Sequence, residues 1–332
     1  PNFRSRESGR SSEARHVAHL SARARLLFSI EVEVRGGIRK DLPPGIRVAP
    51  DQVLVGNGSN ELLVAVMQCL VDAETTVIVA HPSFSLYEHY ARILGATIVG
   101  ASIDLQSGLL PVETMVAAAG SSSGRTVIFA CSPNNPSGSV LPPGGLERLL
   151  ETGAMVMLDR AYGEFVDQAP PPPMDRLIIL STFSKAWGLA GLRIGWLTST
   201  AEIVREIRKV KLPYNLNVAS EEIALAALEE KERLSATIEA IVRDRDFMAG
   251  EMRELGLEVF PSSANFLLFR TDDADRVFNG LLFSGVLVRD VSAAPGLSGC
   301  LRVSVGTREE NQSFIGALRA LVPTEVEAAP WV

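Results

Sequence analysis

The sequence is poor in cysteine, in aromatic residues and in positive charge. Its three cysteines, Cys69, Cys131 and Cys300, are odd in number and far apart in the chain, which favours reduced thiols over a disulfide framework. Acidic residues outnumber basic ones and give a net charge of -7. Because binding to a phosphate backbone needs a basic surface, we expect no nucleic-acid partner.

Long apolar runs and a signal pattern are also missing. No apolar stretch approaches the roughly 20 residues that span a bilayer, and no basic start leads into an apolar segment as in a secretory signal. We therefore expect a cytoplasmic protein with no membrane partner. From Pro1 to about Arg35 the chain is rich in arginine and serine. Transit peptides share this composition, but we favour a helical arm that packs on a partner subunit. His16 and His19 have no cysteine or carboxylate pattern beside them, so we expect no metal site.

What is present is enough apolar sequence for two cores, since 46% of the 332 residues are hydrophobic. Short, continuous apolar runs at 76–80, 125–132, 154–159 and 176–182 predict strands that are buried on both faces. Helical patterns at 84–95 and 146–153 stand between them. This alternation predicts an α/β fold with a mainly parallel sheet sandwiched by helices.

The last third of the chain has a different pattern. A charged helical region from Ser220 to about Leu255 precedes strand candidates at 264–270, 285–291 and 301–307, and a final helix begins near Glu309. This order is typical of a smaller α+β domain. We predict an atypical N-terminal arm at 1–44, a large domain at 45–219 and a small C-terminal domain at 220–332.

Ligands of open α/β sheets bind outside the carboxyl ends of the strands, so the polar residues after each apolar run are candidates. The first such segment is "GNGSNELL", where a helix begins near Ser59 after a glycine turn. Free N–H groups at a helix start bind phosphate well, although a tight turn with a serine cap explains the same letters. A dinucleotide fingerprint fails, because Glu61 stands where that pattern needs a small residue.

Further candidates follow the later strands. Asn135 lies in the turn "CSPNNPSG", Asp159 ends an apolar run, and Tyr162 follows it. Taken singly, the turn explains Asn135 and a helix cap explains Asp159. Lys185 stands among small and hydroxyl residues with Arg193 shortly after it, and a buried ammonium is costly unless it is used. Pyridoxal phosphate is one cofactor that needs a lysine, a carboxylate, hydrogen-bond donors and an anion cradle together.

The segments "SPNNPSG", "DRAY", "STFSKAWGLAGLRIG" and "GLSGCLRVSVGTREEN" resemble, in order and spacing, the fold-type I pyridoxal-phosphate-dependent aminotransferases. The resemblance covers roughly residues 49 to 321 and is greatest to the histidinol-phosphate aminotransferases. It implies the aspartate aminotransferase-like fold, the cofactor pyridoxal 5'-phosphate and a homodimer. It also implies transamination of histidinol phosphate with 2-oxoglutarate in histidine biosynthesis.

The resemblance also implies roles for single residues. Lys185 would hold the cofactor as a Schiff base and move the proton during the reaction. Asp159 would keep the ring nitrogen protonated, and Asn135 and Tyr162 would hydrogen-bond the phenolic oxygen. The cofactor's phosphate would be held by the backbone of Gly58, Ser59 and Asn60 together with Thr182, Ser184 and Arg193.

Three more residues complete the implied site. Phe84 would stack on the ring, where the family usually has a tyrosine. Arg302 would bind the carboxylate of the amino donor, and Arg289 is our candidate for a second anion contact, the substrate's phosphate. Both arginines also fit an ordinary surface position.

The sequence departs from the family in its first part. The family has an Asn-Glu-x-Pro element and an early tyrosine, and neither is found before Val48. Arg160 replaces the glutamate that usually follows the key aspartate. Two other functions therefore stay open: a threonine-phosphate decarboxylase of cobalamin biosynthesis, and a pyridoxal-phosphate-binding protein with little catalysis. A nicotinamide enzyme is disfavoured because of Glu61.

Overall fold

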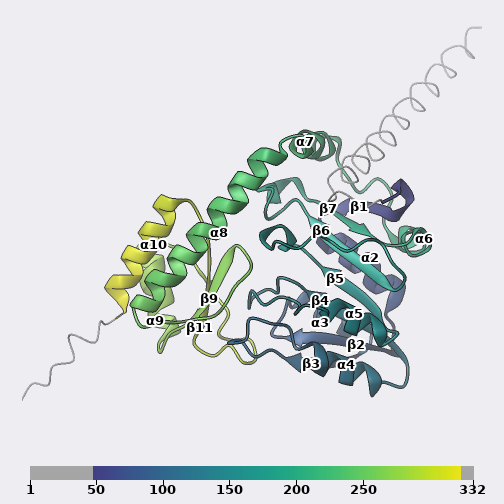
Figure 1. Cartoon of the computed structure of the whole chain (residues 1–332), viewed down its shortest axis with the longest axis horizontal. Coiled ribbons are helices and arrows are strands. Elements are labelled where there is room, and N and C mark those ends of the chain that lie inside the picture. Colours follow the sequence, from purple (N-terminus) through teal and green to yellow (C-terminus); the bar gives the residue numbers. More distant parts are fainter. Residues whose placement is uncertain (1–47, 323–332) are drawn as a thin grey trace, which may run out of the picture.

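The structure is a computed structural model that describes residues 48–322. The predicted arm at 1–44, with His16 and His19, lies outside the described residues. Two sheets organise the rest (Figure 1). Among the described residues, no helix combines the length and hydropathy that crossing a bilayer requires.

The larger sheet has seven strands in the order β1-β7-β6-β5-β4-β2-β3. Their bounds are β1 (Val53–Asn57), β2 (Thr75–His81), β3 (Thr97–Ser102), β4 (Arg125–Cys131), β5 (Met155–Asp159), β6 (Leu177–Thr182) and β7 (Ile194–Thr198). All neighbours pair in parallel except β7, which runs antiparallel to β1 and to β6. The predicted, mainly parallel α/β sheet is confirmed.

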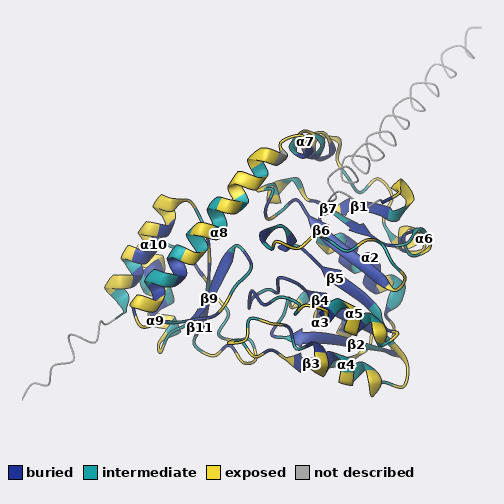
Figure 2. Ribbon diagram, viewed as in Figure 1, coloured by how far each residue is buried: buried dark blue, intermediate teal, exposed yellow. Residues whose placement is uncertain are grey.

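Helices cover both faces of this sheet, and this explains why its strands are apolar on both sides. One face packs on α2 (Ser59–Leu70), α3 (Leu86–Ile93) and α6 (Ala201–Val210). The other face packs on α4 (Val112–Gly120) and α5 (Gly145–Glu151). Every residue of β6 is buried, and the strands form the dark interior in Figure 2.

The smaller sheet is antiparallel, with the order β10-β11-β9-β8. Its strands are β8 (Glu258–Val259), β9 (Phe266–Arg270), β10 (Arg289–Asp290) and β11 (Cys300–Ser304). The helices α9 (Ala274–Phe283) and α10 (Arg308–Leu321) contribute to its separate apolar core. This second sheet agrees with the smaller α+β unit that the sequence predicts.

The predicted helical region from 220 to 255 is two helices, α7 (Val218–Leu228) and α8 (Lys231–Glu254). On α7, Ala224 and Leu228 pack with residues of β1 and β7. The last turns of α8 bury Met248 and Met252 in the small core. As Figure 1 shows, α8 therefore reaches from the large sheet to the small one.

Candidate active site

The topology gathers the sequence-predicted residues at one edge of the large sheet. Because β1 and β6 are both antiparallel to β7, they run parallel to each other and to β2, β4 and β5. The carboxyl ends of these strands, and the start of β7, thus share one edge. The residues at or just after them are Gly58, Ser59, Asn60, Phe84, Asn135, Asp159, Tyr162, Thr182, Ser184, Lys185 and Arg193.

Asp159 is the last residue of β5, and only 5% of its surface is exposed. Its Oδ1 accepts a hydrogen bond from the backbone N–H of Ala161 at 2.9 Å. Its Oδ2 accepts one from the hydroxyl of Tyr87 at 2.6 Å. Burial raises the pKa of Asp159, while these donors and the charge of Lys185 oppose that rise. The site therefore contains a desolvated carboxylate with a donor on each oxygen.

Lys185 lies in the turn that follows β6, with Nζ 5.3 Å from the centre of the Tyr162 ring. Partial burial lowers the pKa of Lys185, and the nearby charges of Arg302 and Arg193 lower it further. Its side chain still reaches solvent at the sheet edge. Such an amine loses its proton more readily than an ordinary lysine and remains accessible to a ligand.

Tyr162 joins this edge to the small sheet. Its ring meets Phe266 of β9 edge-on, with the ring centres 5.1 Å apart. The guanidinium of Arg302 lies over the other ring, 4.8 Å from the centre of Phe266. Burial raises the pKa of Tyr162 to about 12, so its hydroxyl is a hydrogen-bond donor at neutral pH.

Arg302 reaches from β11 to the edge of the large sheet, where it donates a hydrogen bond to the side-chain oxygen of Asn135. Its Nε is buried and has no hydrogen-bond partner among the described residues. Arg289 stands opposite Arg302 across the β10–β11 pair, and both line a cavity of about 380 Å³. A guanidinium with an unpartnered buried N–H, next to a second guanidinium, is suited to an anionic ligand.

The start of α2 forms a second anion-binding arrangement. Gly58 has a φ of +78°, and a Cβ at this position would lie 2.3 Å from Nη2 of Arg193. Arg193 donates to Ser184 Oγ at 3.5 Å, and Thr182 Oγ1 donates to the same oxygen at 2.9 Å. Ser59 and Asn60 open the helix, so their N–H groups have no partner within it. A cradle of backbone N–H groups, hydroxyls and one guanidinium fits a phosphate.

Asn134 and Asn135 have different surroundings, although they are neighbours in sequence. Asn134 is fully buried, and its amide donates to the carbonyl of Pro82 and to Ser137 Oγ at 2.9 and 2.8 Å. That network holds the turn together. Asn135 is the partner of Arg302, so of the two asparagines it is the one at the candidate site.

Two features of the site were not predicted from the sequence. One is the hydrogen bond from the Tyr87 hydroxyl to Asp159, because a tyrosine at this position of a helix is typical of a core residue. Phe84 lies beside Tyr87, with ring centres 5.6 Å apart. The other is the direction of Arg160. Its guanidinium donates hydrogen bonds to the carbonyls of Gly163 and Gln168 at 3.2 and 2.6 Å rather than to Asp159.

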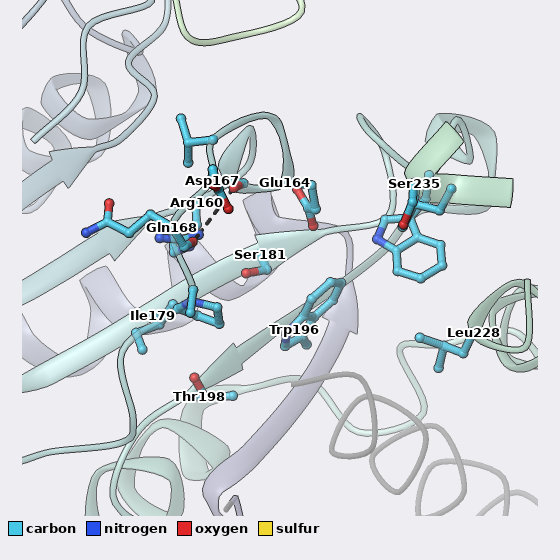
Figure 3. Close-up of a pocket in the computed structure, with 16 residues that line it drawn as sticks. Arg160, Glu164, Asp167, Gln168, Ile179, Ser181, Trp196, Thr198, Leu228 and Ser235 are labelled. Carbon is cyan, nitrogen blue, oxygen red and sulfur yellow. Dashed lines mark hydrogen bonds between the residues drawn. The ribbon is translucent and has the colours of Figure 1, made fainter. Parts of the chain in front are cut away.

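Arg160 instead lines a cavity of about 490 Å³ that also contacts Glu164, Ser181 and Trp196 (Figure 3). None of the predicted site residues lines it. Strand β6 contributes Ile179 and Ser181 to this cavity, and because side chains alternate along a strand, Thr182 points to the other face of the sheet. Oε2 of Glu164 is buried, and within residues 48–322 it has no hydrogen-bond partner. Burial raises the pKa of Glu164 from 4.5 to about 7, although the charge of Arg160 acts against this rise.

A raised pKa in the folded state makes stability depend on pH. The unfolded chain releases the Glu164 proton near pH 4.5 and the folded chain near pH 7, so stability falls as the pH rises across this interval. We expect Glu164→Gln to remove this loss. Its free energy of unfolding relative to the wild type should therefore rise by about 1–3 kcal/mol from pH 5 to pH 8. Urea unfolding at both pH values measures it. Asp167→Asn, at an exposed carboxyl nearby, is the control, and an equal gain in both variants would contradict the assignment.

Comparison with known proteins agrees with this geometry. The family model "Aminotransferase class I and II" matches residues 36–318. The histidinol-phosphate aminotransferase of Caldanaerobacter subterraneus is 37% identical over 293 residues, which are 86% of this chain and 82% of that protein.

Two solved structures share the fold. The histidinol-phosphate aminotransferase of Sinorhizobium meliloti in complex with pyridoxal-5'-phosphate has a TM-score of 0.79 and 24% identity, covering 88% of this chain and 81% of its own. The L-threonine-O-3-phosphate decarboxylase of Porphyromonas gingivalis has a TM-score of 0.75 and 24% identity, with 87% and 88% covered. The family match and the lysine, carboxylate and phosphate cradle at the sheet edge lead to one conclusion: the chain belongs to the class I and II aminotransferases and is a fold-type I enzyme that depends on pyridoxal phosphate.

Proposed function

We propose that this enzyme transfers the amino group of histidinol phosphate to 2-oxoglutarate. The observation that carries the proposal is the similarity to relatives of that name, at 37% and 36% identity over 86% and 82% of this chain in two of them. The pair Arg302 and Arg289 supports it, because a phosphorylated donor and a dicarboxylic acceptor both present anions.

The cradle and the carboxylate described above support a cofactor position at this edge of the large sheet. When bound, pyridoxal phosphate supplies an electron-poor ring that withdraws electrons from the carbon that loses its proton. Gly58, Ser59 and Asn60, with Thr182, Ser184 and Arg193, would hold its phosphate. Phe84 would lie against the ring.

The chain's own residues supply the remaining chemistry. Lys185 would bind the cofactor through its amine and then carry the proton, for which a lowered pKa is suited. Asp159 would hold a positive charge at the ring nitrogen, since it is the buried carboxylate of the edge. Tyr162 and the amide of Asn135 would donate hydrogen bonds to the ring oxygen. Histidinol phosphate has no carboxylate, so its anionic end is the phosphate, and Arg302 would bind that phosphate together with Arg289, which lines the same cavity.

The test uses the purified full chain supplied with pyridoxal phosphate. Glutamate formed from histidinol phosphate and 2-oxoglutarate supports the proposal. Carbon dioxide released from threonine phosphate, without glutamate, would replace it by the decarboxylase. A bound cofactor with neither product would indicate a binding protein with little catalysis.

Arg302 gives a more specific prediction. Arg302→Ala removes the guanidinium and should raise KM for the amino donor roughly 10- to 100-fold, since a hydrogen-bonded charge pair is lost. Steady-state kinetics at saturating acceptor measures the change. Arg270→Ala is the control, because Arg270 on β9 pairs with Glu258 at 2.6 Å, away from the site. An unchanged KM in Arg302→Ala would exclude the role.

We also propose the assembly and the domains that the sequence analysis predicts. The second apolar core, which contains Met248 and Leu318, supports a small domain within 220–332, with α7 packing back on the large domain at 45–219. A homodimer in the cytoplasm, in which residues 1–44 contact the partner, completes the proposal. Light scattering of the full chain and of a chain that begins at residue 45 tests the dimer and the arm.

A further inference from the structure

Tyr87 and Asp159 form a hydrogen bond between residues far apart in sequence. Oη of Tyr87 lies 2.6 Å from Oδ2 of Asp159, and both residues are buried, with exposed fractions of 0% and 5%. This distance is typical of a hydroxyl that donates to an ionised carboxylate, whose bonds are shorter than neutral ones.

Packing holds the Tyr87 ring in place. The ring stacks on Phe129 of β4 with centres 5.4 Å apart and an angle of 23°. Phe84 meets the same ring edge-on at 82°. A tyrosine fixed on two sides cannot turn its hydroxyl away from Asp159 without disturbing the core, so the donor is preorganised.

The surroundings of Asp159 show why this donor matters. Tyr87 from α3, Cys131 from β4, Tyr162 after β5 and Lys185 after β6 are the titratable groups around it. Burial raises the pKa of Asp159, and among the opposing effects the Tyr87 hydroxyl is the largest, ahead of the Ala161 N–H and Lys185. Cys131 is itself buried, and burial raises its pKa, so it stays a neutral thiol and adds no second negative charge beside Asp159.

We propose that Tyr87 is a positioning residue whose hydroxyl keeps Asp159 ionised and fixes the orientation of its carboxylate toward the cofactor. The role rests on the proposed function, since Asp159 is there the partner of the ring nitrogen. The alternative is that Tyr87 only fills space between α3 and β4. The two differ in the hydroxyl, because the ring alone would satisfy a packing role.

Tyr87→Phe removes the hydroxyl and keeps the ring. Without its strongest donor, Asp159 should ionise at a pH higher by roughly one unit. Carbon-13 NMR of the full chain labelled at aspartate carboxyls measures this before cofactor is added, and the Asp159 signal is the one missing from Asp159→Asn. The same variant should bind pyridoxal phosphate about tenfold more weakly at pH 8, measured by titration of the visible absorbance.

Tyr90→Phe is the matched control, since Tyr90 lies one turn later on α3 and packs on the same core. It should change neither the carboxyl titration nor cofactor affinity. An Asp159 titration in Tyr87→Phe that equals the wild type would overturn the proposal. So would a shifted titration with unchanged cofactor affinity. Failure of the proposed function is separate, because it appears as a wild type that binds cofactor and makes no glutamate, while the carboxyl titration still reports on Tyr87.

Discussion

Replacing Lys185 by alanine is expected to lower transamination by at least about 10³-fold. Lys185 is the amine at the sheet edge, and its pKa is lowered by burial and by two arginines. It would serve both as the cofactor's attachment and as the proton carrier, and loss of a positioned acid–base group alone costs about 10²–10⁴-fold.

Glutamate formation by Lys185→Ala, compared with wild type at saturating pyridoxal phosphate, measures this loss. Borohydride reduction followed by peptide mapping gives an independent readout, because the cofactor should be attached irreversibly to the peptide that contains Lys185. The control is Lys209→Ala, at a surface lysine of α6 paired with Glu206 at 2.5 Å. Activity within tenfold of wild type in Lys185→Ala, or a label on another lysine, would refute the assignment.

Asp159→Asn should reduce kcat about 10³-fold while the fold is kept. The amide has the shape of the carboxylate and its oxygen can still accept a bond from Ala161 or Tyr87, so packing changes little. It lacks the negative charge that would hold a proton on the ring nitrogen, and in a desolvated site such a charge is worth several orders of magnitude in rate.

Steady-state kcat and the thermal unfolding midpoint, measured on the same preparation, separate chemistry from stability. Asp175→Asn is the control, since Asp175 is an exposed carboxyl beside Arg176 in the segment before β6. A kcat for Asp159→Asn close to that of the wild type would show that this carboxylate is not the partner of the cofactor ring.

The sequence predicts the central strands and the residues at their ends. The runs at 76–80, 125–132, 154–159 and 176–182 correspond to β2, β4, β5 and β6, because strands buried on both faces must be continuously apolar. The polar residue that ends such a run lies at the sheet edge, and Asp159 was found in this way. In these four strands the apolar run of the sequence and the observed strand overlap closely.

Other features depend on contacts that no local pattern records. The direction of β7 is one, since an apolar run looks the same in a parallel and in an antiparallel strand. The strand predicted at 285–291 is only Arg289–Asp290, at the edge of its sheet, where pairing on one side leaves the rest irregular. Tyr87 is the third case, because its role needs Asp159, 72 residues away.

The bond between Arg302 and Asn135 has a consequence for the polarity of the amide. A guanidinium only donates hydrogen bonds, so the end of Asn135 that meets it must be the carbonyl oxygen. The NH₂ end is then left for an acceptor on the other side. An anion that bound Arg302 would break this hydrogen bond and allow the Asn135 amide to rotate. Binding of an anion at the small sheet would therefore change the orientation of Asn135 at the edge of the large sheet.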